Sequence, residues 1–176
     1  AARPHVGVWQ GAARDEGSDC EACEAGHLVR WRLVDEDYEG AMEAAAPVLD
    51  GRLECEEEPA LTLSRVPHAL LALGRPEEAF EMMGRALEAV AEGGAYAEAR
   101  ARLMQMLLIT GNVEAAARLL EISLPQVVAG GNELNLMQTC VMGTTILEVL
   151  RRRGIEAPAL ETPRGDAEAW MRAQVE

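Results

Sequence analysis

The chain of 176 residues contains no lysine, so any basic surface has to be built from its 16 arginines. These stand against 30 acidic residues, and the formal net charge is −14. A nucleic-acid-binding surface needs clustered positive charge to neutralise phosphates. The charge balance therefore excludes nucleic acid as the expected partner and indicates an acidic protein.

Long hydrophobic runs are also missing. No run approaches the roughly 20 apolar residues that span a bilayer, and residues 1–9 lack the apolar core of a signal peptide. We therefore expect a cytoplasmic protein with no membrane partner. Disulfides are rare in that compartment, so the four cysteines are expected to be free.

Aromatic residues make up only 3% of the chain, whereas 49% of it is hydrophobic, much of this alanine and leucine. Such a composition favours close helix packing over sheets. The phrase Gly-Arg-Pro-Glu-Glu-Ala begins at Gly74, and a related phrase, Gly-Asn-Val-Glu-Ala-Ala, begins at Gly111, 37 residues later. A weaker copy covers residues 35–41. Each lies between apolar helical stretches, which predicts stacked helix-turn-helix units in an all-α fold of seven to eight helices.

The chain divides into an irregular lead-in (1–17), a helical repeat domain (18–153), and a linker with a C-terminal capping helix (154–176). The spacing of Ser18 and Glu21 suits a capping box at the first helix, and Thr162-Pro163 suits the start of the last one. The helices expected between them cover residues 18–34, 37–49, 59–73, 76–91, 95–110, 113–128 and 133–153.

The segments around Gly74 and Gly111 resemble tetratricopeptide repeats, with Ala79 and Ala116 at the family's small-residue positions. The resemblance covers residues 20–129 and departs from the family in its spacing of 37 rather than about 34 residues. It implies a right-handed superhelix of antiparallel helix pairs, an α-solenoid. It also implies a concave groove lined by the first helix of each pair, and a function as a protein-interaction module.

A second signal is the spacing of Cys20, Cys23 and His27, which would share one face of the first helix. In a stack of antiparallel pairs, the loop that enters the second pair returns to the edge where the first pair began. Cys55 lies in that loop. Three thiolates and an imidazole form a standard tetrahedral shell, which predicts a structural zinc ion at the N-terminal edge.

Other interpretations of these residues stay open. The fourth ligand is one of His27, Glu57 or His5, and the cysteines are alternatively small half-buried hydrophobes or a redox pair. Cys140, in a long apolar helix, is expected in the core. The acidic run over residues 54–58 is interpreted as charge compensation at the start of the next helix.

The third signal is a polar stripe on the first helices of the pairs. Arg65 and Arg102 occupy equivalent repeat positions, 37 residues apart. Arginine forks there would pair with an acidic peptide or a C-terminal carboxylate; alternatively, they pair within the stack with Glu98 or Glu78. The other expected groove residues are Arg30, Ser64, His68, Gln105, Asn135 and Gln138.

No phosphate-binding glycine loop, nucleophile elbow or paired-histidine metal motif is present in the sequence. We therefore expect a binding protein rather than an enzyme. The alternative is a small-molecule-binding or catalytic accessory protein that uses the same groove, and the sequence leaves a homo-oligomer open.

Overall fold

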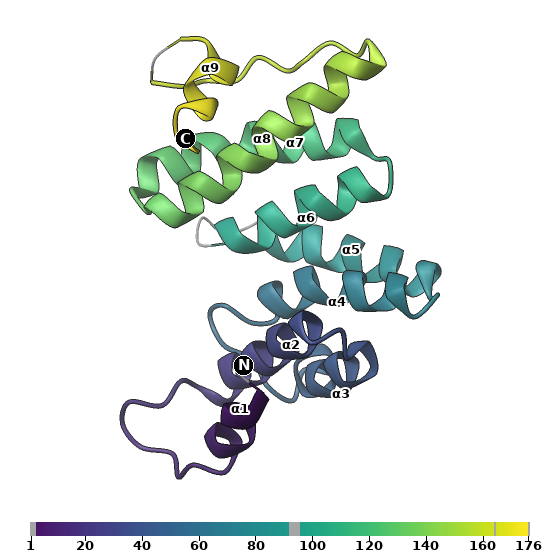
Figure 1. Ribbon diagram of the computed structural model, residues 1–176, viewed down its shortest axis with the longest axis vertical. Helices are drawn as coiled ribbons and strands as arrows, with labels where there is room; N and C mark the ends of the chain where they lie inside the picture. Colours follow the sequence, from purple (N-terminus) through teal and green to yellow (C-terminus); the bar gives the residue numbers. More distant parts are fainter. Residues whose placement is uncertain (1–2, 92–95, 164, 176) are drawn as a thin grey trace.

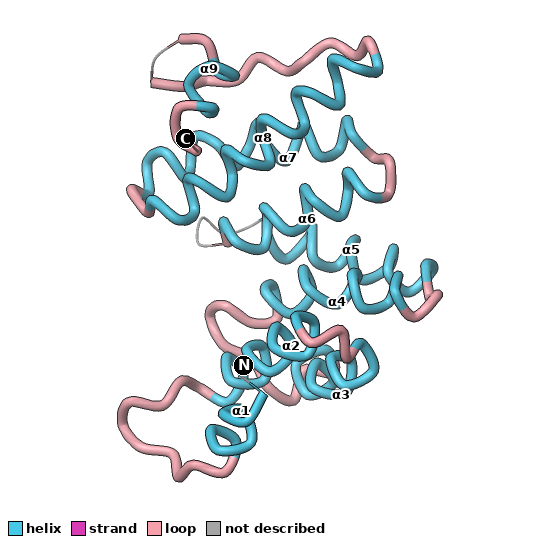
Figure 2. The backbone as a smooth tube through the Cα atoms, viewed as in Figure 1, coloured by secondary structure: helices cyan, strands magenta, loops and turns pink. Residues whose placement is uncertain are grey.

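The computed structural model describes residues 3–91, 96–163 and 165–175. These ranges form nine helices and no strand, which confirms the all-α prediction, although the expected count of seven to eight was too low (Figure 1, Figure 2). None of the described helices is long and apolar enough to cross a membrane. The helices are α1 (Arg3–Gln10), α2 (Glu21–Val34), α3 (Tyr38–Leu49), α4 (Ala60–Ala72), α5 (Pro76–Ala91), α6 (Ala97–Ile109), α7 (Val113–Gly130), α8 (Glu133–Arg153) and α9 (Ala167–Arg172).

Most helix boundaries lie within two residues of those expected, and α5 and α8 match them. Two starts were wrong. Helix α2 begins at Glu21 because Cys20, not Ser18, caps it, and α9 begins at Ala167 because the Asp166 carboxylate accepts a hydrogen bond from the Ala169 amide at 2.9 Å. The start expected at residue 95 lies outside the described residues.

The lead-in is not wholly irregular, because it contains the eight-residue helix α1. In the described chain this helix makes no backbone contact with another helix, and its Val8 side chain is 73% exposed. Residues 1–17 show no apolar periodicity that would predict a helix there.

The remaining helices pack in two sets. Each helix from α2 to α8 contacts the next one along the chain, and α2, α4, α6 and α8 also contact one another in succession (Figure 1). Within the described ranges, α3, α5 and α7 do not contact one another. The helices α2, α4, α6 and α8 therefore form one continuous row, and the second helices of the pairs lie against it.

Three turns of the stack share one geometry. Glu36, Gly74 and Gly111 end α2, α4 and α6 with φ angles of 59°, 72° and 83°. After each, the next amide donates to the carbonyl five residues earlier, at 2.8 to 2.9 Å, which is the hydrogen bond of a Schellman motif. The two repeated phrases and their weaker third copy therefore mark equivalent turns, although glutamate replaces glycine in the first.

Small residues follow these turns at the helix crossings. Ala41, Ala79 and Ala116 are 0%, 1% and 0% exposed, as the repeat register predicts. A side chain without bulk lets two helix backbones approach closely. The spacing of the repeated phrases therefore identifies a buried alanine in each of α3, α5 and α7.

The main hydrophobic core runs from α4 to α9, and a smaller cluster lies between α2, α3 and α4. At the far end Met171 of α9 is fully buried against α8. A Cβ atom at Gly143 would stand 2.5 Å from the Met171 sulfur, so this glycine makes room for α9. Helix α9 thus covers the end of the row, where a capping helix was expected.

Candidate functional site

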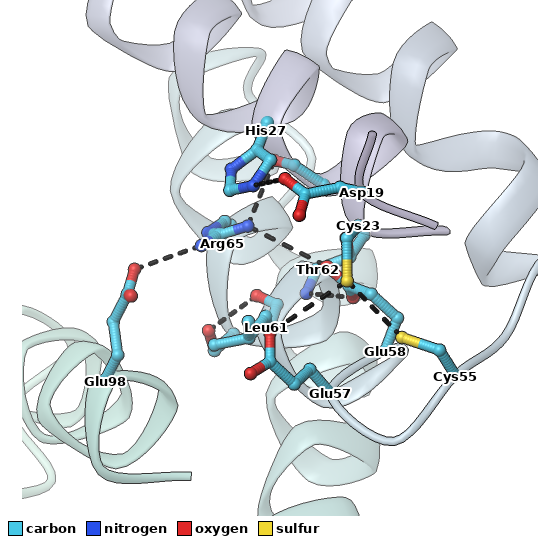
Figure 3. A network of polar contacts seen from close by, with 12 residues as sticks. Asp19, Cys23, His27, Cys55, Glu57, Glu58, Leu61, Thr62, Arg65 and Glu98 are labelled. Atoms are coloured by element: carbon cyan, nitrogen blue, oxygen red, sulfur yellow. Dashed lines mark hydrogen bonds and ion pairs between the residues drawn. The ribbon is translucent and has the colours of Figure 1, made fainter. Parts of the chain in front are cut away.

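Three cysteines from two segments meet beside the start of α2. Cys20 and Cys23 come from the beginning of that helix, and Cys55 comes from the loop between α3 and α4. Their sulfur atoms all lie within 4.8 Å of one another, and the Sγ atoms of Cys23 and Cys55 are 3.5 Å apart (Figure 3). The three cysteines are free thiols. The prediction that the loop returns to the start of the first helix is confirmed, and the cluster could hold a metal ion.

The local backbone explains how α2 presents two of these thiols. Cys20 has extended φ and ψ angles of −65° and 156°, and its sulfur accepts a hydrogen bond from the Cys23 amide at 3.3 Å. That hydrogen bond lowers the pKa of the Cys20 thiol. Burial raises the pKa of the Cys23 thiol. The Cys20 thiol therefore loses its proton more readily than the Cys23 thiol. Two negative thiolates this close together would repel each other, so the two thiols do not ionise independently.

The cluster has dimensions that suit a tetrahedral metal site. For a metal ion about 2.3 Å from each thiolate, the distance between two sulfurs of a tetrahedron is about 3.8 Å. The Cys23–Cys55 separation of 3.5 Å differs from this by a fraction of an ångström. Cys140 does not take part, because it is fully buried in the core, where burial raises its pKa to about 11.

The structure does not bring His27 into the cluster. Its ring lies on the same helix, but its Nε2 atom is 3.2 Å from a carboxylate oxygen of Asp19, and its side chain is 52% exposed (Figure 3). Within the described chain, the group of donors close enough to share one ion consists of the three cysteines alone. The prediction that His27 is the fourth ligand is therefore not supported by its position.

A buried ionic network lies directly beside the cysteines. Arg65 and Glu58 are 3% and 2% exposed, and their nearest charged atoms are 3.9 Å apart. Arg65 also donates to the Gly26 carbonyl and to Glu98, both at 3.0 Å, and Glu58 accepts from the Thr62 amide at 2.9 Å (Figure 3). Burial raises the pKa of the Glu58 carboxyl, although the hydrogen bond from Thr62 and the charge of Arg65 oppose this. The network joins α2, α4, α6 and the loop that carries Cys55.

Sequence reasoning missed both Glu58 and Gly26. Glu58 was assigned to charge compensation, but it is buried. A Cβ atom at Gly26 would stand 2.1 Å from a carboxylate oxygen of Glu58, so the glycine is what leaves room for that side chain. The only signal in the sequence was a glycine inside an otherwise helical pattern, which often has a packing reason.

Two adjoining hollows run along the row of α2, α4, α6 and α8. One of about 310 Å³ lies between α2, α4 and α6, and one of about 350 Å³ lies between α6 and α8. Arg102 and Gln105 line both, so the hollows are neighbours that share part of their walls. The first is also lined by Arg30, Leu33, Val34, Ser64, Arg65, His68 and Met106, and the second by Glu98, Ala101, Met137, Gln138, Val141 and Met142.

Seven of the eight residues expected in a groove therefore line these hollows, but they do not all face solvent. Ser64 and Arg65 are buried in the wall, with the Ser64 hydroxyl donating to the Leu61 carbonyl at 2.7 Å. Asn135 lines neither hollow. The exposed or half-exposed members are Arg30, His68, Arg102, Gln105 and Gln138.

The arginine pair behaves as the alternative interpretation predicted. Arg65 and Arg102 both contact one carboxylate oxygen of Glu98, at 3.0 and 3.2 Å. Arg65 is therefore a structural side chain that cannot turn toward a partner without breaking a buried network, whereas Arg102 is 34% exposed.

We compared the chain with models of protein families, with curated proteins and with solved structures, and no significant match was found.

Proposed function

We propose that this chain is a helical-repeat protein of the tetratricopeptide type that binds a segment of another protein along α2, α4, α6 and α8. The contact pattern supports it. The first helices of the pairs contact one another in succession, while the second helices do not. A stack of helix pairs curves toward the side on which its helices lie closer together. The first helices of the pairs would then line the concave face of a right-handed superhelix.

The observation that carries the binding proposal is the pair of adjoining hollows. Arg30, His68 and Arg102 bring basic groups to the first hollow in a chain whose net charge is −14. Glu98 offsets part of this charge, because its carboxylate pairs with Arg102 as well as with Arg65. An acidic side chain or a terminal carboxylate of the partner would pair with these groups.

One wall of the second hollow is apolar and is made by Met137, Val141 and Met142. Met137 and Val141 are 42% and 44% exposed, so they are available to a partner's apolar side chain. Because Arg30, His68 and Gln105 are exposed, the trough is open, which favours an extended peptide over an enclosed small molecule.

The test is a selection from a random peptide library with free carboxyl termini, with affinities then measured by fluorescence anisotropy. Wild type and an Arg75→Ala control should enrich the same acidic peptides, because Arg75 pairs with Glu78 at an exposed turn outside both hollows. Arg30→Ala and Arg102→Ala should each weaken binding. Equal binding by all variants, or no enrichment by wild type, would contradict the proposal.

We further propose that the three cysteines hold a structural zinc ion that joins the start of α2 to the loop between α3 and α4. Thiolates are zinc ligands, and free thiols persist in the reducing cytoplasm, where we place the protein. Untagged protein purified under reducing conditions should contain one zinc ion per chain, and chelation should lower the melting temperature. Protein without zinc whose melting is unchanged by added zinc or by chelator would refute this.

A further inference from the structure

The three thiols leave the fourth position of a tetrahedral site to another donor. Glu57 lies two residues after Cys55, and its Oε2 atom is 4.0 Å from the Cys23 sulfur (Figure 3). In a zinc tetrahedron with bonds of about 2.3 Å to sulfur and about 2.0–2.2 Å to a carboxylate oxygen, the sulfur–oxygen distance is about 3.6 Å. The observed distance to Cys23 is close to this value, and because Glu57 is not within 4.8 Å of all three sulfurs, its side chain has to turn toward Cys20 and Cys55 to complete the site.

The competing donor on α2 is less well placed. His27 shares a helix face with Cys23, four residues away, but it is not among the donors that lie within 4.8 Å of one another. Its Nε2 atom already contacts the Asp19 carboxylate, so ligation through that atom would cost this interaction. Glu57 is exposed, and its carboxylate lies 4.0 Å from the Cys23 sulfur.

The loop that carries Cys55 and Glu57 is held in three places. The Cys55 amide donates to the Glu58 carbonyl at 3.2 Å, the Tyr96 hydroxyl donates to the Glu56 carbonyl at 2.8 Å, and the Glu58 side chain is anchored in the buried network. Ligands on a braced loop lose less conformational freedom when they bind an ion. The fold therefore holds this half of the site before the ion arrives.

From this geometry we propose that Glu57 is the fourth ligand, which makes the cluster a three-cysteine, one-glutamate site for a divalent ion of tetrahedral preference. The inference rests on the zinc site proposed above. A carboxylate is a hard ligand that suits Zn²⁺, whereas Cu⁺ is soft and is satisfied by thiolates. The Zn²⁺ affinity should therefore depend on Glu57, whereas the Cu⁺ affinity should depend on the three sulfurs alone.

The test uses the full chain, reduced, with Zn²⁺ and Cu⁺ affinities measured by competition with chromophoric chelators and with Co²⁺ absorption as a report on ligand number. Glu57→Gln should lower Zn²⁺ affinity about tenfold or more, weaken the tetrahedral Co²⁺ bands and leave Cu⁺ affinity unchanged. The matched control is Glu56→Gln, which alters a neighbouring exposed carboxylate, and His27→Ala tests the competing ligand. Both should bind Zn²⁺ like wild type. Circular dichroism of the metal-free variants checks that each one folds.

The outcomes separate this inference from the one on which it rests. If wild type binds Zn²⁺ and Glu57→Gln binds it equally well, the assignment of Glu57 is wrong while the zinc site stands. A loss of affinity in His27→Ala alone would overturn the assignment in favour of the histidine. If wild type binds neither Zn²⁺ nor Co²⁺, the zinc site itself fails, and the fourth ligand fails with it.

Discussion

Replacing Arg65 by alanine should strongly destabilise the protein, although Arg65 lines a hollow at the surface. The side chain is 3% exposed and donates to the Gly26 carbonyl and to Glu98, both at 3.0 Å. Its removal also leaves Glu58, which is 2% exposed, without its nearest positive charge at 3.9 Å. Leaving one charge of a buried pair uncompensated typically costs about 3–5 kcal/mol. We therefore expect Arg65→Ala to lower the free energy of unfolding by about this amount.

The measurement is urea unfolding followed by circular dichroism, with thermal melting as a second readout. For a chain of this length a loss of about 3–5 kcal/mol corresponds to a fall in melting temperature of about 6–20 °C. Arg75→Ala is the matched control, because Arg75 and Glu78 form an exposed pair, with side chains that are 44% and 53% exposed. Exposed pairs contribute about 0–1 kcal/mol, so this control should remain close to wild type.

A second variant tests the cause of the effect. Glu58→Gln keeps an acceptor for the Thr62 amide but removes the buried negative charge, so Arg65→Ala should cost less in that background than in wild type. The reasoning would be refuted if Arg65→Ala cost less than about 1 kcal/mol, or if its cost were the same in both backgrounds. The first result would mean that Arg65 is not held in a buried ionic network, and the second that its contribution does not come from Glu58.

Three further predictions concern the repeat framework. Glu36→Gly should stabilise the protein by about 0.5–1 kcal/mol in urea unfolding, because glycine accepts the left-handed φ of 59° without steric cost; a loss of stability would contradict this. Ala79→Leu and Ala116→Leu, at positions 1% and 0% exposed, should each cost about 1–3 kcal/mol by overpacking, and unchanged melting in both would refute the repeat register. Burial raises the pKa of Glu98, but its two arginine partners outweigh it and leave the net pKa below the ordinary 4.5. The ionised carboxylate thus stabilises the fold above that value, and the stability advantage of wild type over Glu98→Gln should shrink as the pH falls through the lowered pKa; a pH-independent difference in melting temperature would contradict this.

The repeat pattern was predictable because it depends on local rules. A glycine in the left-handed region ends a helix, and a small residue lets two helices cross, whatever the rest of the chain does. Gly74, Gly111, Ala79 and Ala116 could therefore be placed from their spacing. Helix α1 could not, since an eight-residue helix whose backbone contacts no other described helix leaves no periodic apolar pattern.

The cysteine cluster was predictable in part. The spacing of Cys20 and Cys23 and the antiparallel course of the first pair sufficed to bring Cys55 to them. The fourth donor to a metal ion could not be predicted, because the sequence alone does not distinguish His27, on the same helix, from Glu57, in the loop. Their relative positions depend on the capping of α2 by Cys20 and on the contact between His27 and Asp19.

By itself, the sequence determined the all-helical fold, the turns that separate the helices, and the three cysteines that meet. Only the tertiary structure decided that Arg65 and Arg102, equivalent in the repeat, play different parts. Arg65 is buried because Gly26, 39 residues away, leaves room for Glu58, and because Glu98, 33 residues away, reaches it from α6. The burial of an ionisable group depends on the segments that close over it, and those segments are distant in the chain, beyond the range of any local pattern.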